Sequence, residues 1–426
     1  MCYVSGLLRM TESRTIAAIA REGRVPEQNM QHFMSNSPWS GRALVEQVQA
    51  AILERRELQG GMLILDESAD EKSGGNSAGA GRQHNGRLGK IDESQVGVYL
   101  AYAHDQTWTM WDGELFVPEK WFSVEAAARR TKAGLPSTQT FQTKVDIGWQ
   151  MIRRAKALGL KFEAVTFDSL YGRSHWLREC CEQNQIEYYA DIPSNYALYR
   201  DVPQVAFERN KRGEPAQQFT VVGQPALSAA TFVNLPQTRW EKMTLRPCER
   251  GHLRVEFARI PVWTVTSSGI VREETLLLKR ENNGIRYTLT NALHSTPLAT
   301  LAHRKCQRYF IERSLQDAKS ELGMADFQAL KYRAWEHHFA LTLVATWFIA
   351  ETCLDWTQEF PPDPQLQHDY TIDVLPRLSV SNVCALLRAA LPLRQLSIQE
   401  AAALVVQHLD NHTCSRRSRL KKRPES

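Results

Sequence analysis

The sequence lacks a pattern of paired cysteines and a long apolar run. Its eight cysteines are scattered and form no Cys-x-x-Cys pair, so neither a zinc ribbon nor a disulfide framework is supported. We therefore expect reduced thiols in a reducing compartment. The longest apolar run, Phe339 to Ala350, is too short to cross a bilayer as a helix and predicts a buried helix. The opening residues, MCYVSGLLRMTESR, lack the features of a signal peptide.

A large excess of charge of one sign is also missing. The formal net charge is +5, and the fractions of hydrophobic residues (43%) and charged residues (23%) are ordinary for a globular protein. This mild basic bias permits a polyanionic partner without indicating one. A length of 426 residues allows two or three domains, or one core with a large insertion.

Residues 1–58 have the pattern of a helical region. Two short helices are predicted between residues 11 and 34, with a possible N-cap at Thr11 or Ser13, a stop at Gly23 and Pro26 in the first turn of the second helix. Two helices joined by a glycine-containing turn suit a DNA-binding helix-turn-helix. A plain helical hairpin has the same pattern, so both interpretations stay open.

Residues 59–194 alternate between strand and helix patterns. Strands are predicted at 62–66, in two stretches between 95 and 118, at 162–168 and at 186–193, and helices at 141–159 and 174–184. A meander that leads into strand–helix–strand crossovers predicts an α/β fold, with a mixed sheet flanked by helices.

The second half of the chain divides into three further regions. Residues 195–302 are β-rich, with a hairpin turn at Asn283-Gly284, and 303–356 are helical. Residues 357–426 are predicted to be largely helical and end in SRRSRLKKR. This basic tail is either a solvated end or a contact for phosphates.

Two carboxylates stand where predicted strands end. Asp66 ends the first strand, and Asp168 ends the strand after the first long helix. If these strands are neighbours, both side chains meet at the edge of the sheet where open α/β folds place their sites. Two adjacent carboxylates repel each other unless a cation intervenes, and Mg²⁺ or Mn²⁺ suits oxygen ligands. Each residue taken alone is better explained by turn chemistry.

A third acidic residue lies on the predicted helix RYFIERSLQDAKSELG. At 100° per residue, Glu312 lies about 40° and Lys319 about 20° from Arg308 around the helix. The apolar residues form a neighbouring stripe, comprising Ile311, Leu315, Ala318 and Leu322. The polar seam formed by Arg308, Glu312 and Lys319 suits either a metal ligand between phosphate-binding cations or an ordinary ion-pair seam.

Together these motifs resemble the DDE transposases of bacterial insertion sequences, over roughly residues 60–340. The chain is most similar to the branch with a Tyr-x2-Arg-x3-Glu-x6-Lys signature and a β-rich insertion before the last catalytic helix. Arg308, Glu312 and Lys319 match that spacing, whereas Lys305 occupies the tyrosine position. The segments ILDES, VTFDSLYG and GRQHNGRLGKIDESQVGVYL also resemble the family. The resemblance implies a ribonuclease-H-like fold.

It further implies metal-dependent cutting of DNA at the ends of the element and joining of those ends to target DNA. Asp66, Asp168 and Glu312 would be the catalytic residues and would hold two Mg²⁺ or Mn²⁺ ions. Glu67, on the other side of an extended chain, is left out of this set. DNA phosphates would contact a further set of residues: Arg308, Lys319, Lys305, Arg82, His84, Arg87 and Lys90.

The implied partners are the terminal inverted repeats of the element and target DNA, bound by a homodimer in the bacterial cytoplasm near the nucleoid, without a membrane. A catalytically inactive, transposase-derived DNA-binding protein is the main alternative. A glycosidase with paired carboxylates is a weaker one, because it leaves the Arg308–Glu312–Lys319 seam unexplained.

Overall fold

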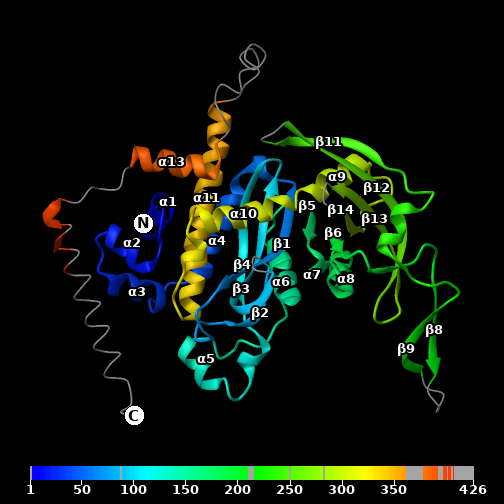
Figure 1. The fold of residues 1–426 in the computed structure, drawn as a ribbon, viewed down its shortest axis with the longest axis horizontal. Coiled ribbons are helices and arrows are strands. Elements are labelled where there is room, and N and C mark those ends of the chain that lie inside the picture. The colour runs from blue at the N-terminus through cyan, green and yellow to red at the C-terminus, as the bar shows by residue number, and fades with distance from the viewer. Residues whose placement is uncertain are drawn as a thin grey trace.

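The computed structural model shows one large mixed sheet with helices on its faces (Figure 1). It describes residues 2–86, 89–209, 215–248, 251–281, 284–360, 378–391, 397–400, 402, 403 and 406. The predicted basic tail and Arg87 lie outside these residues, as does Asn283.

Four helices precede the first strand: α1 (Cys2–Arg9), α2 (Ile16–Glu22), α3 (Glu27–Ser35) and α4 (Gly41–Glu54). The N-cap of α2 is Thr15, which accepts a hydrogen bond from the backbone of Ala18, so the predicted caps Thr11 and Ser13 were wrong. Pro26 is the N-cap of α3 and not a residue of its first turn. These helices pack together and against α11 (Tyr332–Glu359).

The sheet has the strand order β11-β12-β13-β14-β6-β5-β1-β3-β2, and β4 also pairs with β3. Its first half contains β1 (Gly61–Glu71), β2 (Gly81–Asn85), β3 (Lys90–His104), β4 (Thr107–Phe116), β5 (Phe162–Phe167) and β6 (Glu187–Ile192). β5 runs parallel to both β1 and β6, whereas β3 is antiparallel to β1. The predicted mixed sheet is therefore confirmed.

Strand β1 is longer than its sequence predicts. The predicted strand ends at Asp66, but the observed one continues to Glu71 because residues 66–71 pair with β3. Burial falls after Leu65, where β5 ends and β1 keeps only its antiparallel neighbour. Asp66 therefore lies within a strand, at the point where the parallel pairing stops.

The strands after β6 extend the same sheet. β11 (Glu241–Cys248), β12 (Gly251–Val265), β13 (Val271–Glu281) and β14 (Gly284–Thr290) pair in sequence, and β14 pairs with β6. Two small sheets accompany them, formed by β7 (Ala197–Leu198) with β10 (Leu227–Ser228) and by β8 (Gln204–Arg209) with β9 (Pro215–Val222).

A buried ion pair fixes this added half to the first half. Arg178 and Glu274 are both fully buried and lie 3.0 Å apart, and Tyr188 and Thr264 donate hydrogen bonds to the carboxylate of Glu274. Arg178 belongs to α8 (His175–Gln183) and Glu274 to β13, so the pair joins the two halves of the sheet.

The remaining helices are α5 (Ala127–Ala133), α6 (Lys144–Ala157), α7 (Ser169–Gly172), α9 (Leu298–Cys306), α10 (Tyr309–Ser320) and α13 (Val380–Ala390). In Figure 1, α11 lies between the helices α1–α3 and the strands β1–β4, and α10 lies alongside those strands. Helix α4 contacts β4 directly, through Arg42 and Asp112. α11 is long and apolar enough to cross a membrane by composition, but it packs against α4 and β4, and half of its most apolar window is buried. That packing is what the sequence predicted for the Phe339–Ala350 run.

Candidate active site

Three acidic residues occupy equivalent positions on three adjacent parallel strands. In the register of β1, β5 and β6, Leu65 pairs with Phe167, and Phe167 pairs with Ala190. The next residues on these strands are Asp66, Asp168 and Asp191, which therefore lie in a row across the sheet. Asp66 and Asp168 thus meet where the sequence predicted, and Asp191 was missed.

Asp168 is both the N-cap of a helix and a neighbour of Asp66. Its Oδ1 accepts hydrogen bonds from the backbone N–H groups of Leu170 (2.9 Å) and Tyr171 (3.4 Å), which makes it the N-cap of α7. Its charge also raises the pKa of Asp66, which shows that the two carboxylates are close. Turn chemistry and proximity to Asp66 are therefore compatible.

Burial dominates the electrostatics of the pair. It raises the pKa of Asp66 to about 7; Arg308 opposes this rise, and Asp168 adds to it. Burial likewise raises the pKa of Asp168, again against the effect of Arg308. The protein therefore holds two carboxylates in an environment that disfavours their charged forms, and additional positive charge would stabilise them.

Helix α10 supplies one such positive charge. Its apolar stripe, Ile311, Leu315, Ala318 and Leu322, is buried as predicted. Arg308, at the start of the helix, donates from Nη2 to Oδ2 of Asp66 (3.3 Å) and from Nη1 to Oε1 of Glu312 (2.8 Å). The Glu312 side chain is 57% exposed. Arg308 therefore contacts both Asp66 and Glu312, and its charge also opposes the rise in the pKa of Asp168.

The other end of the polar seam lies further along β1. Lys319 donates from Nζ to Oδ1 of Asp70 (2.5 Å) and to the backbone oxygen of Ala69 (3.0 Å). Arg308 and Lys319 thus follow β1 from Asp66 to Asp70. Both cations have carboxylate partners in the absence of DNA, and any phosphate that they bind has to replace or share those partners.

Lys305 also has a carboxylate partner. Its Nζ lies 2.7 Å from Oδ1 of Asp191, and Thr288 on β14 donates to the same carboxylate (2.6 Å). Burial would raise the pKa of Asp191, but Lys305 and Arg308 together lower it. A signal for Asp191 was present in the sequence, because it comes near the end of the third predicted parallel strand, as Asp66 and Asp168 come at the ends of the other two.

The remaining predicted phosphate ligands lie away from the carboxylates. Arg82 and His84 are exposed on β2, and Lys90 begins β3, where it pairs with Asp92. Arg82 pairs with Glu93 of β3, six residues from Tyr99, the partner of Asp66. Six residues at about 3.3 Å each place Arg82 about 20 Å along the strand from Asp66. These residues therefore do not belong to the carboxylate cluster.

The chemistry of the cluster suits a divalent cation. Asp66 and Asp168 provide the carboxylate oxygens that Mg²⁺ and Mn²⁺ prefer. Glu67 turns to the other side, where it pairs with Lys144 (2.8 Å) and accepts from Tyr171 (3.2 Å). Among the described residues, no three His, Cys, Asp or Glu side chains are already close enough together to hold a metal ion. The guanidinium of Arg308 lies between Asp66 and Glu312 instead.

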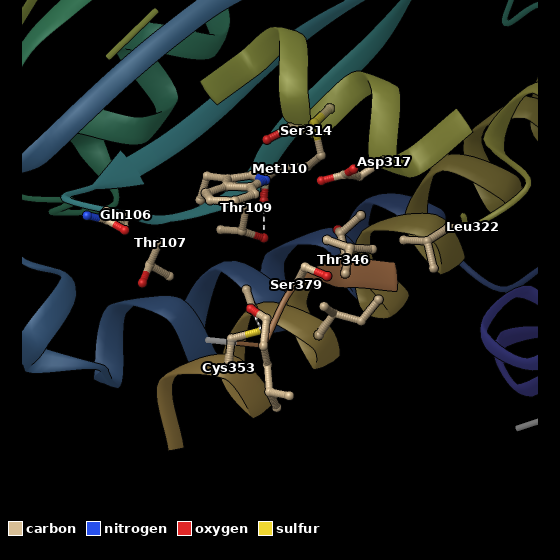
Figure 2. Close-up of a pocket in the computed structure, with 15 residues that line it drawn as sticks. Gln106, Thr107, Thr109, Met110, Ser314, Asp317, Leu322, Thr346, Cys353 and Ser379 are labelled. Carbon is tan, nitrogen blue, oxygen red and sulfur yellow. Dashed lines mark hydrogen bonds between the residues drawn. The ribbon is translucent and has the colours of Figure 1, made fainter. Parts of the chain in front are cut away.

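A separate cavity lies on the other side of α10. Figure 2 shows Ser314 and Asp317 of α10 on one wall, with Cys353 and Ser379 across from them. Its volume is about 70 Å³. Ser314 and Asp317 lie about 240° and 180° from Arg308 around the helix, far from the angular positions of Glu312 and Lys319. This cavity is therefore not part of the carboxylate site.

Comparison with known proteins assigns the family. The model of the DDE superfamily endonuclease family matches residues 1–252, which is more than half of the chain. The chain belongs to the DDE superfamily endonucleases. This match includes Asp66, Asp168 and Asp191 but ends before α10. A similar protein is the probable transposase for insertion sequence element IS701 of Microchaete diplosiphon, which is 26% identical over 333 residues, covering 77% of this chain and 75% of the relative.

The family match includes the three acidic residues that lie in a row across the sheet. The family match covers strands β1, β5 and β6, which carry the row, together with the helices α6, α7 and α8 that connect them. Glu312 lies outside the matched residues. In the structure it contacts Arg308, which in turn contacts Asp66.

Proposed function

We propose that this protein is the DNA transposase of an insertion sequence. The observation that carries the proposal is the pair of partly buried carboxylates, Asp66 and Asp168, at the point where the adjacent strands β1 and β5 stop pairing, with Arg308 and Glu312 at the start of α10 beside Asp66. The family match and the similarity to a probable insertion-sequence transposase support it. The strand order supports a ribonuclease-H-like core, and the strands β7–β14 correspond to the β-rich insertion of the Tyr-Arg-Glu-Lys branch.

Asp66, Asp168 and Glu312 would hold two Mg²⁺ or Mn²⁺ ions. Bound there, the ions would activate the attacking water or DNA 3′-hydroxyl and stabilise the leaving oxygen of a phosphoryl transfer. The rigid pairing of β1 with β3 and β5 fixes the position of Asp66, and the α7 cap fixes that of Asp168. Glu312 is more exposed and approaches from α10, so we place the scissile phosphate between the start of that helix and the ends of the β1–β5 pairing.

The cations of α9 and α10 would position the DNA. Arg308 and Lys319 lie along β1, and Lys305 lies beside them on α9, so together they present a row of positive charge next to the carboxylates. Guanidinium and ammonium groups in such a row suit successive phosphates of one strand. Arg82, His84 and Lys90, at the far end of the sheet, would contact the backbone at a distance from the cut.

We further propose that the active form is a homodimer on DNA in the bacterial cytoplasm, because two element ends have to be cut and joined together. A catalytically inactive DNA-binding protein is the competing function. It accounts for the cations equally well, but not for the partly buried carboxylate pair, whose charged forms burial disfavours.

Strand cleavage tests the proposal. The substrate is a labelled duplex taken from the DNA that flanks this gene, incubated with the full chain and Mg²⁺. Asp168→Asn, which preserves the cap of α7, is expected to lower cleavage at least about a hundredfold, since a metal ligand is lost. Asp92→Asn is the matched control, because Asp92 is an exposed carboxylate on the same sheet.

Binding to the same duplex should survive in Asp168→Asn and weaken steeply as salt is raised. Binding without cleavage by the unmodified chain would favour the inactive DNA-binding protein. Equal cleavage by the unmodified chain and Asp168→Asn would remove Asp168 from the mechanism.

A further inference from the structure

Arg308 lies among three carboxylates that come from three different elements. Its Nη2 is 3.3 Å from Oδ2 of Asp66, its Nη1 is 2.8 Å from Oε1 of Glu312, and its Nε is 3.8 Å from Oδ2 of Asp191. The Nε atom is buried and has no hydrogen-bond partner among the described residues. The guanidinium is thus bound to Asp66 and Glu312, while its remaining nitrogen lies next to Asp191 at more than hydrogen-bond distance.

Asp191 is the fixed member of this group. It lies on β6, between β5 and β14, and accepts a hydrogen bond from Thr288 (2.6 Å). Lys305 contacts both of its carboxylate oxygens, at 2.7 and 2.9 Å. Arg308, by contrast, holds its guanidinium on a long side chain at the start of a helix. A rearrangement among these groups would therefore move Arg308 and leave Asp191 in place.

The contacts of Arg308 conflict with the proposed metal site. The oxygens that Arg308 contacts, Oδ2 of Asp66 and Oε1 of Glu312, belong to two of the carboxylates that would hold a divalent cation. A guanidinium and a divalent ion on the same oxygens repel each other strongly at this degree of burial. Arg308 therefore has to leave these two carboxylates, at least in part, before they can hold a metal ion.

We propose that Asp191 is a positioning residue that receives Arg308 when divalent cations bind to Asp66 and Glu312. The inference rests on the proposed function, because it requires a metal site at these carboxylates. In the metal-free protein Arg308 neutralises Asp66 and Glu312. In the metal-bound protein it closes the 3.8 Å gap to Asp191 and remains beside the site as a cation available to DNA.

Binding of Mn²⁺ to the full chain without DNA tests this coupling, and the free ion is measured by electron paramagnetic resonance. Asp191→Asn removes the acceptor and is expected to weaken Mn²⁺ binding about five- to tenfold, a typical coupling between sites. Arg308→Gln removes the competing cation and is expected to strengthen Mn²⁺ binding. In the double variant, the effect of Asp191→Asn should fall below about twofold, because no guanidinium remains to be received.

A simple field effect predicts a different result. If Asp191 acted only through its charge, Asp191→Asn would weaken Mn²⁺ binding by the same factor with and without Arg308, and additive effects would overturn the inference. Asp66→Asn separates this failure from failure of the proposed function. If Asp66→Asn left Mn²⁺ binding unchanged, the metal site itself would be wrong. If it abolished binding while the other two variants were additive, only the role of Asp191 would fall.

Folding of the variants is checked by circular dichroism and thermal unfolding. Asparagine can still accept the hydrogen bond from Thr288, which favours a folded Asp191→Asn variant. Lys305→Gln provides a second route that leaves Asp191 intact. It frees Asp191 for Arg308, so it should strengthen Mn²⁺ binding when Arg308 is present. It should have no effect on Mn²⁺ binding when Arg308 is replaced by glutamine. An equal effect in both backgrounds would again contradict the proposal.

Discussion

Asp66→Asn is expected to stabilise the metal-free protein while it abolishes cleavage. Burial raises the pKa of Asp66 from 3.8 to about 7, although Arg308 opposes the rise. Because the folded-state pKa exceeds the unfolded-state value, the contribution of this carboxyl group to stability is complete below about pH 4 and is lost as the pH rises towards 7. Asparagine carries no charge and avoids this loss.

The size of the expected stabilisation follows from the pKa shift of Asp66. A rise in pKa of about three units corresponds to a loss of about 4 kcal/mol in the free energy of unfolding at pH 8, which is an upper bound. The pKa of about 7 already includes the attraction to Arg308, but the charged carboxylate can gain water, which reduces its cost. We therefore expect Asp66→Asn to raise the free energy of unfolding by about 1–2 kcal/mol at pH 8.

The assay is urea unfolding in EDTA at pH 5, 6.5 and 8, with Asp191→Asn as the matched control. Burial alone would raise the pKa of Asp191, but Lys305 and Arg308 lower it overall, so its charge contributes stability that is lost as the pH falls through the lowered value. Asp191→Asn should therefore destabilise the protein at pH 8, the opposite sign. An Asp66→Asn variant that is less stable than the unmodified chain at pH 8, or a difference that does not grow with pH, would refute the reasoning.

Other substitutions test the packing around the site. Glu274→Gln is expected to lower the free energy of unfolding by about 3–5 kcal/mol in urea unfolding, because it leaves the buried Arg178 without its carboxylate partner. Glu256→Gln, at the partly exposed pair with Arg280, should lower the free energy of unfolding by less than about 1 kcal/mol. Gly172→Ala would place a Cβ atom 1.9 Å from a backbone oxygen of β6, so both thermal stability and DNA cleavage should fall sharply, and unchanged values would contradict that packing. Burial lowers the pKa of His338 to about 4, so stability should be lost as the pH falls from about 6.5 towards 4. In thermal unfolding, His338→Gln should reduce this dependence on pH. An equal dependence on pH in both proteins would exclude His338 as the cause.

The sequence was sufficient for the parts of the site that depend on local pattern. The apolar run before Asp66 and the one before Asp168 predicted two strands, and their parallel pairing brings the carboxylates together. The helical period predicted the seam of Arg308, Glu312 and Lys319 along one side of α10. These are properties of single elements, and neighbouring residues determine them.

The partners of the cations could not be predicted in this way. Residues 66–71 are polar and resemble a loop, and they are a strand only because β3 pairs with them, so the contact of Asp70 with Lys319 was hidden. Asp191 and Thr288 are 97 residues apart in the chain and meet because β14 pairs with β6. The short helices α5 and α7 were also missed, because each is too short to show a period.

The distribution of the site along the chain bears on when it forms during synthesis. Asp66, Asp168 and Asp191 leave the ribosome first, and the β strands that follow are made before α9 and α10 bring Lys305, Arg308 and Glu312. A polypeptide that stops before residue 298 has the first two carboxylates but none of the groups that balance or complete them. On the proposed function, fragments from interrupted translation would lack Arg308 and Glu312 and would be unable to cut the chromosome of the cell that makes them.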